Sequence, residues 1–245
     1  MSYFKKYIEN KRVIFVGPAQ SIVKKTKGKF INSFEAVART NGAIFLLDNR
    51  NYQLDYGSKC TILYTNVQFH RESGPFTDEQ LMDWKRKYNL QFLCMKTCSQ
   101  IHFDRYNKII CTRTIGDVIG ELHKQIQGAL MGPILLTDLA NHNPKRLYFT
   151  GMDFYINKPD MFIPGDYREY FPGYMPDKIV KKADIANIGR VDPHDQYSNA
   201  KYLYDMCKKG ILETDQEIIN IMETILDNPK YYSYQGKLER VGRKK

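Results

Sequence analysis

The sequence of 245 residues lacks the short motifs that would assign it to several well-known classes of enzyme. No Gly-x-Gly-x-x-Gly follows an apolar run, so the main support for a dinucleotide-binding protein is missing. The segment from Gly17 to Thr26 has some likeness to a phosphate-binding loop, but it lacks the second glycine before the lysine, which argues against a P-loop kinase. No Gly-x-Ser-x-Gly is present, which argues against a hydrolase with a nucleophile elbow.

Patterns that bind metal ions are also absent from the sequence. It contains no Asp-x-Asp, the carboxylate pair with which many transferases hold a metal ion. The five cysteines are an odd number, and Cys94 and Cys98 have no matching pair of Cys or His for zinc. We therefore expect no metal and no cofactor. Cysteine usage of this kind favours a reducing, cytoplasmic setting, which would be the host cytoplasm if the chain is viral.

Long apolar runs are missing as well. No N-terminal run resembles a signal peptide, and none approaches the roughly 20 residues that cross a bilayer, so we expect no membrane span. Acidic residues are outnumbered by basic ones, 27 to 37, which gives a formal net charge of +10. Such a charge favours polyanionic partners, although part of it lies near the chain ends, where charged residues are commonly just solvated.

The chain contains short apolar runs that alternate with helical patterns. Continuous apolar runs are typical of strands buried on both faces of a parallel sheet. The alternation predicts an α/β fold, with a single Rossmann-like domain over residues 1–245 whose mostly parallel sheet is flanked by helices. The predicted strands are Arg12–Gly17, Ala43–Leu47, Thr61–Tyr64, Lys108–Cys111 and Arg146–Thr150.

Three helices are predicted from their periodicity and end signals. One begins near Thr114, because Thr114-Ile-Gly-Asp117 resembles a capping box. A second runs from about Ser198 to Lys209 and stops at Gly210. A third begins at Thr214 and ends before Asn228-Pro229. The Pro-, Gly- and Tyr-rich stretch 157–176 has no clear period, and its length is typical of a functional lid or a disordered segment.

The turn after the first strand is a candidate phosphate site. Ligands of open α/β sheets bind beyond the carboxyl ends of the strands, where the start of a helix offers free backbone N–H groups. Gly17 would allow close approach of the backbone, and Gln20 or Ser21 could add a donor. A plain strand-to-helix turn is the alternative.

Three blocks of the sequence resemble the motifs of a known family. The segment from Val13 to Asn41 joins a hydrophobic strand, Gly17-Pro-Ala-Gln-Ser21 and Arg39-Thr-Asn41, and resembles the large sialyl motif of the eukaryotic-type sialyltransferases, with Asp55-Tyr-Gly57-Ser-Lys-Cys-Thr61 as its continuation. The segment from Gly128 to Tyr155, with Gly132 and Gly151-Met-Asp-Phe-Tyr155, resembles the small motif. Asp192-Pro-His194 resembles the very small motif.

The resemblance implies a GT-A-like variant fold and an inverting, metal-independent transfer of a sugar from a nucleotide sugar, with CMP favoured and UDP as the other nucleotide. It implies that His194 is the catalytic base. It also suggests a nucleotide-binding half at 12–112, an acceptor and catalytic half at 113–227 and a basic tail at 228–245. The donor-binding candidates are Gly17, Gln20, Ser21, Asn41, Gly132 and Asp153, and the candidates for leaving-group or acceptor contacts are Tyr167, Tyr170 and Tyr174.

The chain departs from the family pattern in several places. Pro18 stands near the position of the family's first nucleotide-binding Asn, and Asn199 stands where the family has Glu after the histidine. The cysteine that begins the large motif in the family is missing. These differences leave the identity of the donor less well determined than the type of reaction.

Two classes of acceptor compete. The net charge of +10 favours a hydroxymethylated base in DNA, as in phage DNA modification, because Lys and Arg side chains supply most non-specific affinity for DNA. The alternative is a carbohydrate acceptor on a surface glycan. A third interpretation is a module that binds a nucleotide or nucleic acid without turnover.

Overall fold

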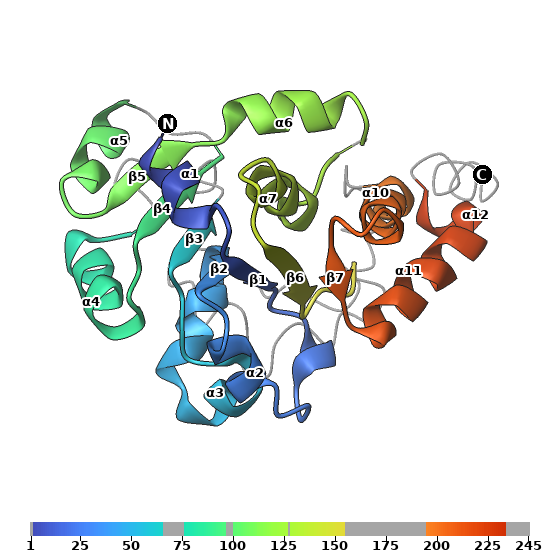
Figure 1. The fold of residues 1–245 in the computed structure, drawn as a ribbon, viewed down its shortest axis with the longest axis horizontal. Coiled ribbons are helices and arrows are strands. Elements are labelled where there is room, and N and C mark those ends of the chain that lie inside the picture. The colour runs from blue at the N-terminus through green and yellow to red at the C-terminus, as the bar shows by residue number, and fades with distance from the viewer. Residues whose placement is uncertain (1, 66–75, 97–99, 127, 155–194, 234–245) are drawn as a thin grey trace, which may run out of the picture.

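The computed structural model describes residues 2–65, 76–96, 100–126, 128–154 and 195–233. Within these ranges, seven strands form one sheet in the order β5-β4-β3-β2-β1-β6-β7 (Figure 1). Every neighbouring pair of strands is parallel. The strands are β1 (Arg12–Val16), β2 (Ala36–Thr40), β3 (Ile62–Thr65), β4 (Phe92–Met95), β5 (Cys111–Thr114), β6 (Arg146–Thr150) and β7 (Glu213–Thr214).

Helices occupy the connections between the strands, as parallel pairing requires, and others precede β1 or follow β7. They are α1 (Tyr3–Ile8), α2 (Gly28–Asn32), α3 (Arg50–Tyr56), α4 (Asp78–Tyr88), α5 (Gln100–Asn107), α6 (Gly116–His123), α7 (Met131–Ala140), α10 (Gln196–Lys208), α11 (Gln216–Asp227) and α12 (Pro229–Tyr232), with 3₁₀ helices η1 (Gln20–Ile22) and η2 (Asn41–Asp48). In the described residues, no helix is long and apolar enough to cross a membrane.

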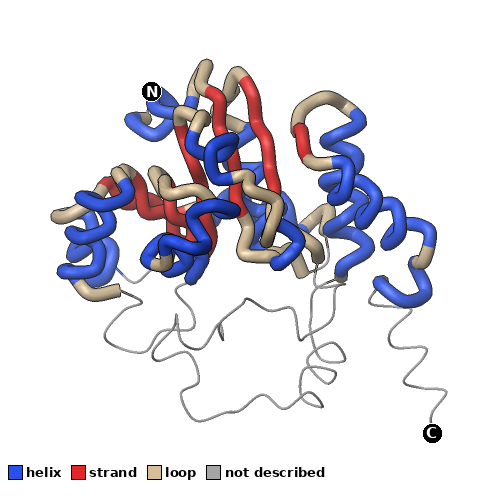
Figure 2. The backbone as a smooth tube through the Cα atoms, turned by 90° about the horizontal axis from the view of Figure 1, so that it is seen from below, coloured by secondary structure: helices blue, strands red, loops and turns tan. Residues whose placement is uncertain are grey.

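The sheet is covered on both faces, which explains why its strands β2, β3 and β4 are buried along their whole length (Figure 2). One face packs against α1, α6, α7, α10 and α11, and its core includes Phe15, Phe92 and Phe149. The other face has two apolar clusters. Leu63 and Leu93 pack with α4, α5 and η2 in one of them, and Ile14 and Val16 pack with α2 and α3 in the other.

The pairing of β1 with β6 joins the two predicted halves of the chain into one sheet. Strand β1 pairs with β2 on one side and with β6 on the other, and Arg12 of β1 lies opposite Arg146 of β6. The predicted strands Arg12–Gly17 and Arg146–Thr150 are therefore confirmed, and Thr61–Tyr64 corresponds to β3 within one residue. The division of function between the two halves stays a prediction.

Two strand predictions are wrong. Ala43–Leu47 is part of the 3₁₀ helix η2, and the preceding residues Ala36–Thr40 form the strand instead. A short buried apolar run has the same composition in either conformation, so periodicity does not distinguish them. Of Lys108–Cys111, only Cys111 lies in a strand, because β5 extends from there to Thr114.

The helix ends are partly as predicted. The capping box at Thr114 is wrong: Thr114 ends β5, and α6 begins at Gly116 without a side-chain cap. The helices α10 and α11 are confirmed, and Gly210 has the positive φ of a helix-terminating glycine. The residue that precedes α11 is Asp215, one position after the predicted Thr214.

A buried polar cluster fixes α7 across the sheet. Asp138 of α7 is 1% exposed and accepts hydrogen bonds from Tyr64 of β3 (2.6 Å) and from both terminal nitrogens of Arg113 of β5 (2.5 and 3.0 Å). Burial acts to raise the pKa of the Asp138 carboxyl, but the neighbouring His142, Arg113 and Tyr64 outweigh it and lower that pKa below its usual value. The orientation of α7 is therefore set by hydrogen bonds to two strands, β3 and β5, and not by apolar packing alone.

Candidate active site

The order of the strands reverses at β1. The chain adds β2 to β5 on one side of β1 and then returns to add β6 and β7 on the other side. In open parallel sheets, such a switch point is where ligands bind, beyond the carboxyl ends of the two central strands. These ends are Val16 of β1 and Thr150 of β6, which lie opposite each other. The residues that follow them are Gly17 and Gly151.

Gly17 and Gly151 lie backbone against backbone. A Cβ atom on Gly17 would stand 2.2 Å from the carbonyl oxygen of Gly151, and one on Gly151 would stand 2.5 Å from that of Gly17. Gly17 donates an N–H bond to Thr150 and Ala19 donates one to Gly151, both at 2.9 Å. Gly151 also has φ of +66°, which favours glycine. The two strand ends at the switch point are thus in direct main-chain contact, and a residue with a side chain at position 17 would prevent the close approach of Gly151.

We expect Gly17→Ala to destabilise the fold by about 1–3 kcal/mol, because the two main chains must separate to make room for the methyl group. Thermal unfolding of the purified variant measures this effect. Gly120→Ala is the matched control, since Gly120 lies in α6 and a Cβ there meets nothing within 4 Å. If Gly17→Ala unfolds at the same temperature as Gly120→Ala, the contact is wrong.

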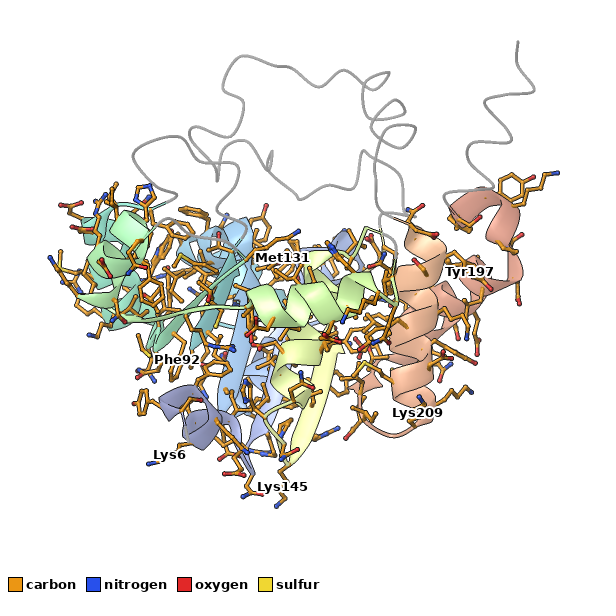
Figure 3. The ribbon with its side chains drawn as sticks, turned by 90° about the horizontal axis from the view of Figure 1, so that it is seen from above. Lys6, Phe92, Met131, Lys145, Tyr197 and Lys209 are labelled. Carbon is orange, nitrogen blue, oxygen red and sulfur yellow. The ribbon has the colours of Figure 1, made fainter. Side chains whose placement is uncertain are left out.

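Gly132 places the start of α7 at the same edge. A Cβ on Gly132 would stand 2.5 Å from the sulfur of Met152 and 3.6 Å from the ring of Phe15. Helix α7 begins at Met131 without a side-chain cap, so its first N–H groups are not used by its own N-cap residue. Figure 3 shows Met131 and Tyr197 toward one side of the molecule, with Lys145 and Lys209 on the opposite side. The positive ends of the α7 and α10 dipoles therefore face the carboxyl edge.

Asn199 joins the starts of α7 and α10. Its side chain is fully buried, and its oxygen accepts the N–H of Leu130, the N-cap residue of α7, at 2.8 Å. Its amide group donates to the carbonyls of Asp195 (2.6 Å) and Gly128 (3.4 Å). A neutral amide suits this position because it can donate and accept at once, whereas the family's Glu could not donate to two carbonyls.

Asp153 lies two residues after Gly151 and is largely buried. It lies close enough to Tyr56 that its negative charge adds to the rise in the pKa of that phenol, of which burial is the main cause. The hydroxyl of Tyr56 donates to the carbonyl of Ala19 at 3.0 Å. Asp153 therefore stands near the residues after Gly17, and its role in donor binding stays a prediction.

A half-buried carboxylate links the carboxyl end of β6 to Lys27. Asp215, next to α11, accepts hydrogen bonds from Thr150 (2.5 Å) and Tyr148 (2.6 Å) of β6 and pairs with Lys27. Burial acts to raise the pKa of the Asp215 carboxyl, but Lys27 and the two hydroxyls lower it below its usual value. The charge of Lys27 is thus already matched by a carboxylate.

The structure brings together some of the predicted site residues. Gly17, Gly132 and Asp153 lie at the switch point, as described above. Ser21 lies half-buried in η1, directly after β1, and Gln20 begins that turn. Asn41 begins η2 at the carboxyl end of β2, the strand next to β1. The other predicted site residues lie outside the described residues: His194, Tyr167, Tyr170 and Tyr174.

Sequence reasoning missed other residues of the site. Gly151 lies in the small-motif block and is not among the predicted site residues, although a glycine directly after a parallel strand is a signal of close backbone approach. Asp55 and Tyr56 were noted only as a motif continuation. In the described residues, no three His, Cys, Asp or Glu side chains are placed to hold one metal ion. Transfer without a metal stays a prediction.

The comparisons with known proteins give matches to solved structures but none to the sequence. No family model and no curated protein matches the sequence. The structure of the sialyltransferase CstII from Campylobacter jejuni with the substrate analogue CMP-3FNeuAc matches with a TM-score of 0.52 and 18% identity, over 83% of this chain and 81% of that one. The structure of a CST-II variant with CMP matches with a TM-score of 0.50, 18% identity and the same coverage. The chain has a sialyltransferase-like α/β fold.

Proposed function

We propose that the protein is an inverting glycosyltransferase that uses a CMP-linked sugar as donor, with a UDP-linked sugar as the other candidate. One observation carries the proposal: Gly17 and Gly151 pack main chain against main chain at the switch point of a fold whose solved example CstII is in complex with the substrate analogue CMP-3FNeuAc. The starts of α7 and α10 add two positive dipole ends to the same edge, which favours the phosphate of a nucleotide.

The described residues suggest how the donor would be held. Backbone N–H groups of the loop after Gly17 and of the start of α7 would bind the phosphate, with Gln20 and Ser21 as further donors. The Asp153 carboxylate would accept hydrogen bonds from hydroxyl groups of the donor, because its negative charge disfavours contact with the phosphate. Asn41, at the end of the neighbouring strand, would bind the nucleoside.

The chemistry would be a single displacement. The acceptor oxygen forms a bond to the anomeric carbon while the bond from that carbon to the phosphate oxygen breaks on the opposite side. His194 takes the proton of the acceptor hydroxyl, for which a neutral imidazole is suited at neutral pH. The nucleotide leaves with the electron pair. Tyr167, Tyr170 and Tyr174 are proposed to donate hydrogen bonds to the leaving phosphate or to contact the acceptor.

We propose a carbohydrate hydroxyl as the acceptor. The net charge of +10 had favoured a hydroxymethylated base in DNA, but the comparisons give no support for DNA as a partner. The matched structure is named as a sialyltransferase, and its fold is shared over most of both chains. A carbohydrate acceptor is therefore the better-supported proposal.

A ligand screen followed by a transfer assay tests the proposal. In thermal-shift measurements, CMP at 100 times its Kd should stabilise the protein by about 2.7 kcal/mol, whereas GMP should not. CMP-sialic acid or another CMP-sugar should then release CMP faster when a galactoside is added than when hydroxymethylated duplex DNA is added. Stabilisation by CMP without any release would indicate a non-catalytic binding module. Stabilisation by no pyrimidine nucleotide would refute the proposed donor.

A further inference from the structure

The loop after β1, residues 18–27 (the β1 loop), has an unusual backbone. Lys24 and Thr26 have φ of +64° and +50°, in the left-handed region. For a β-branched residue such as threonine this conformation is rare and costs free energy, so it persists only where the surroundings hold it. The β1 loop therefore requires an external partner to keep this shape.

That partner is α3. Asp55 accepts the N–H of Lys24 with one carboxylate oxygen and the N–H of Thr26 with the other, both at 2.8 Å. Asp55 is only 7% exposed. Both strained residues thus donate to a single carboxylate about 30 positions away in the sequence, and charge-assisted bonds of this kind are stronger than neutral ones.

Two further contacts hold the ends of the β1 loop on α3. The hydroxyl of Tyr56, a fully buried residue, donates to the carbonyl of Ala19 at 3.0 Å, one residue beyond Pro18. At the other end, a Cβ on Gly28 would stand 2.2 Å from the carbonyl oxygen of Gln53. The β1 loop is therefore held against α3 near its first residues, and Gly28, directly after the loop, holds its end there.

Arg39 of β2 in turn holds the carboxyl end of the helix α3 in place. Arg39 is fully buried, and its guanidinium donates to the carbonyls of Tyr56 (2.5 Å) and Lys59 (2.9 Å), at the carboxyl end of α3. Burial lowers the pKa of Arg39 to about 10, so it stays charged at neutral pH. A cation at this end of a helix is favourable for the helix dipole. The arginine of the Arg39-Thr-Asn41 motif thus supports α3.

We propose that α3 sets the conformation of the β1 loop for the donor, and that Asp55 and Tyr56 are positioning residues that raise donor affinity without touching the donor. This inference rests on the proposed function, because it assigns the β1 loop to the donor nucleotide. The apparent Kd of a ligand rises in inverse proportion to the fraction of molecules that are competent to bind. Loosening the loop should therefore weaken nucleotide binding while the rest of the fold stays intact.

Asp55→Asn tests this directly, because an amide keeps the shape but leaves one oxygen for two N–H donors. We expect the Kd for CMP to rise about 10- to 100-fold, if the loop is competent in only about one molecule in 10 to 100. The KM for the donor should rise likewise, with kcat at saturating donor unchanged, since bound donor restores the loop. Hydrogen exchange at the amides of Lys24 and Thr26 should become faster.

Tyr56→Phe provides a second variant in case Asp55→Asn does not fold. It removes one hydrogen bond to a main-chain carbonyl and should raise the Kd for CMP by about 2- to 10-fold. Tyr106→Phe is the matched control. Tyr106 lies on α5, near the far edge of the sheet, is as buried as Tyr56, and likewise donates a hydrogen bond to a main-chain carbonyl, that of Phe76. It should bind CMP as the wild type does.

The outcomes separate the two proposals. If the wild type binds CMP and both Asp55→Asn and Tyr56→Phe bind it equally well, the positioning role is overturned and the proposed function stands. If Tyr106→Phe weakens CMP binding as much as Tyr56→Phe, the effect is general loss of stability and the positioning role is again overturned. If the wild type binds no pyrimidine nucleotide, the proposed donor is refuted, and the inference about α3 falls with it.

Discussion

His194→Ala should lower kcat by about 10²- to 10⁴-fold and leave the Kd for CMP unchanged. The range is what a positioned general base typically contributes to a proton transfer. The nucleotide contacts proposed for Gly17, Gly132 and Asp153 do not involve the imidazole, so binding should survive its removal. Release of CMP from a CMP-sugar in the presence of acceptor measures kcat, and titration calorimetry measures the Kd.

The control is His123→Ala, which replaces an exposed histidine at the end of α6. It should transfer sugar at the wild-type rate. Wild-type turnover by His194→Ala would assign the base to another residue. Equal losses of kcat and of CMP affinity would instead show that His194 serves to hold the structure, and the proposed base would then be wrong.

Asn199→Asp should have the largest effect on stability. The change converts the amide nitrogen that donates to Asp195 and Gly128 into an oxygen, so a carboxylate would face two carbonyl oxygens at a fully buried site. An uncompensated buried charge costs about 3–5 kcal/mol. In a chain of this size, that corresponds to a fall of roughly 6–20 °C in the unfolding midpoint, to be measured by differential scanning calorimetry.

Asn220→Asp makes the same chemical change at an exposed position of α11 and should leave the midpoint nearly unchanged. Asn199→Ala offers a second comparison, since it removes the three hydrogen bonds without adding a charge and should cost less than Asn199→Asp. Should Asn199→Asp unfold at the same temperature as Asn220→Asp, the contacts between α7 and α10 would not be as described.

The sequence allowed the central strands and the fold class to be predicted, but not every element. Strands β1 and β6 are largely apolar because both faces of the sheet are covered. Such a run can be recognised in a single sequence. Strand β2, Ala-Val-Ala-Arg-Thr, was missed because its small side chains and the buried Arg39 do not resemble an apolar run. The more apolar segment that follows it forms η2 instead.

The candidate site was predictable only where a local pattern marks it. A glycine after an apolar run identified Gly17, and the motif blocks identified Gly132 and Asp153. The pairing of Gly17 with Gly151 depends on which strand lies next to β1, and the hydrogen bonds of Asp55 to the β1 loop depend on how α3 packs. Both relations join residues far apart in the sequence, so neither has a local signature.

The pairing of β1 with β6 also has a consequence for the order of folding. Val16 and Thr150 are neighbours in the sheet, yet four other strands, β2 to β5, lie between them in the sequence. Closing so long a segment costs chain entropy and slows folding. During synthesis, an N-terminal stretch that ends before β6 can assemble strands β1 to β5 but cannot bring Gly151 to Gly17. A nucleotide would therefore stabilise the finished chain, not its nascent intermediates.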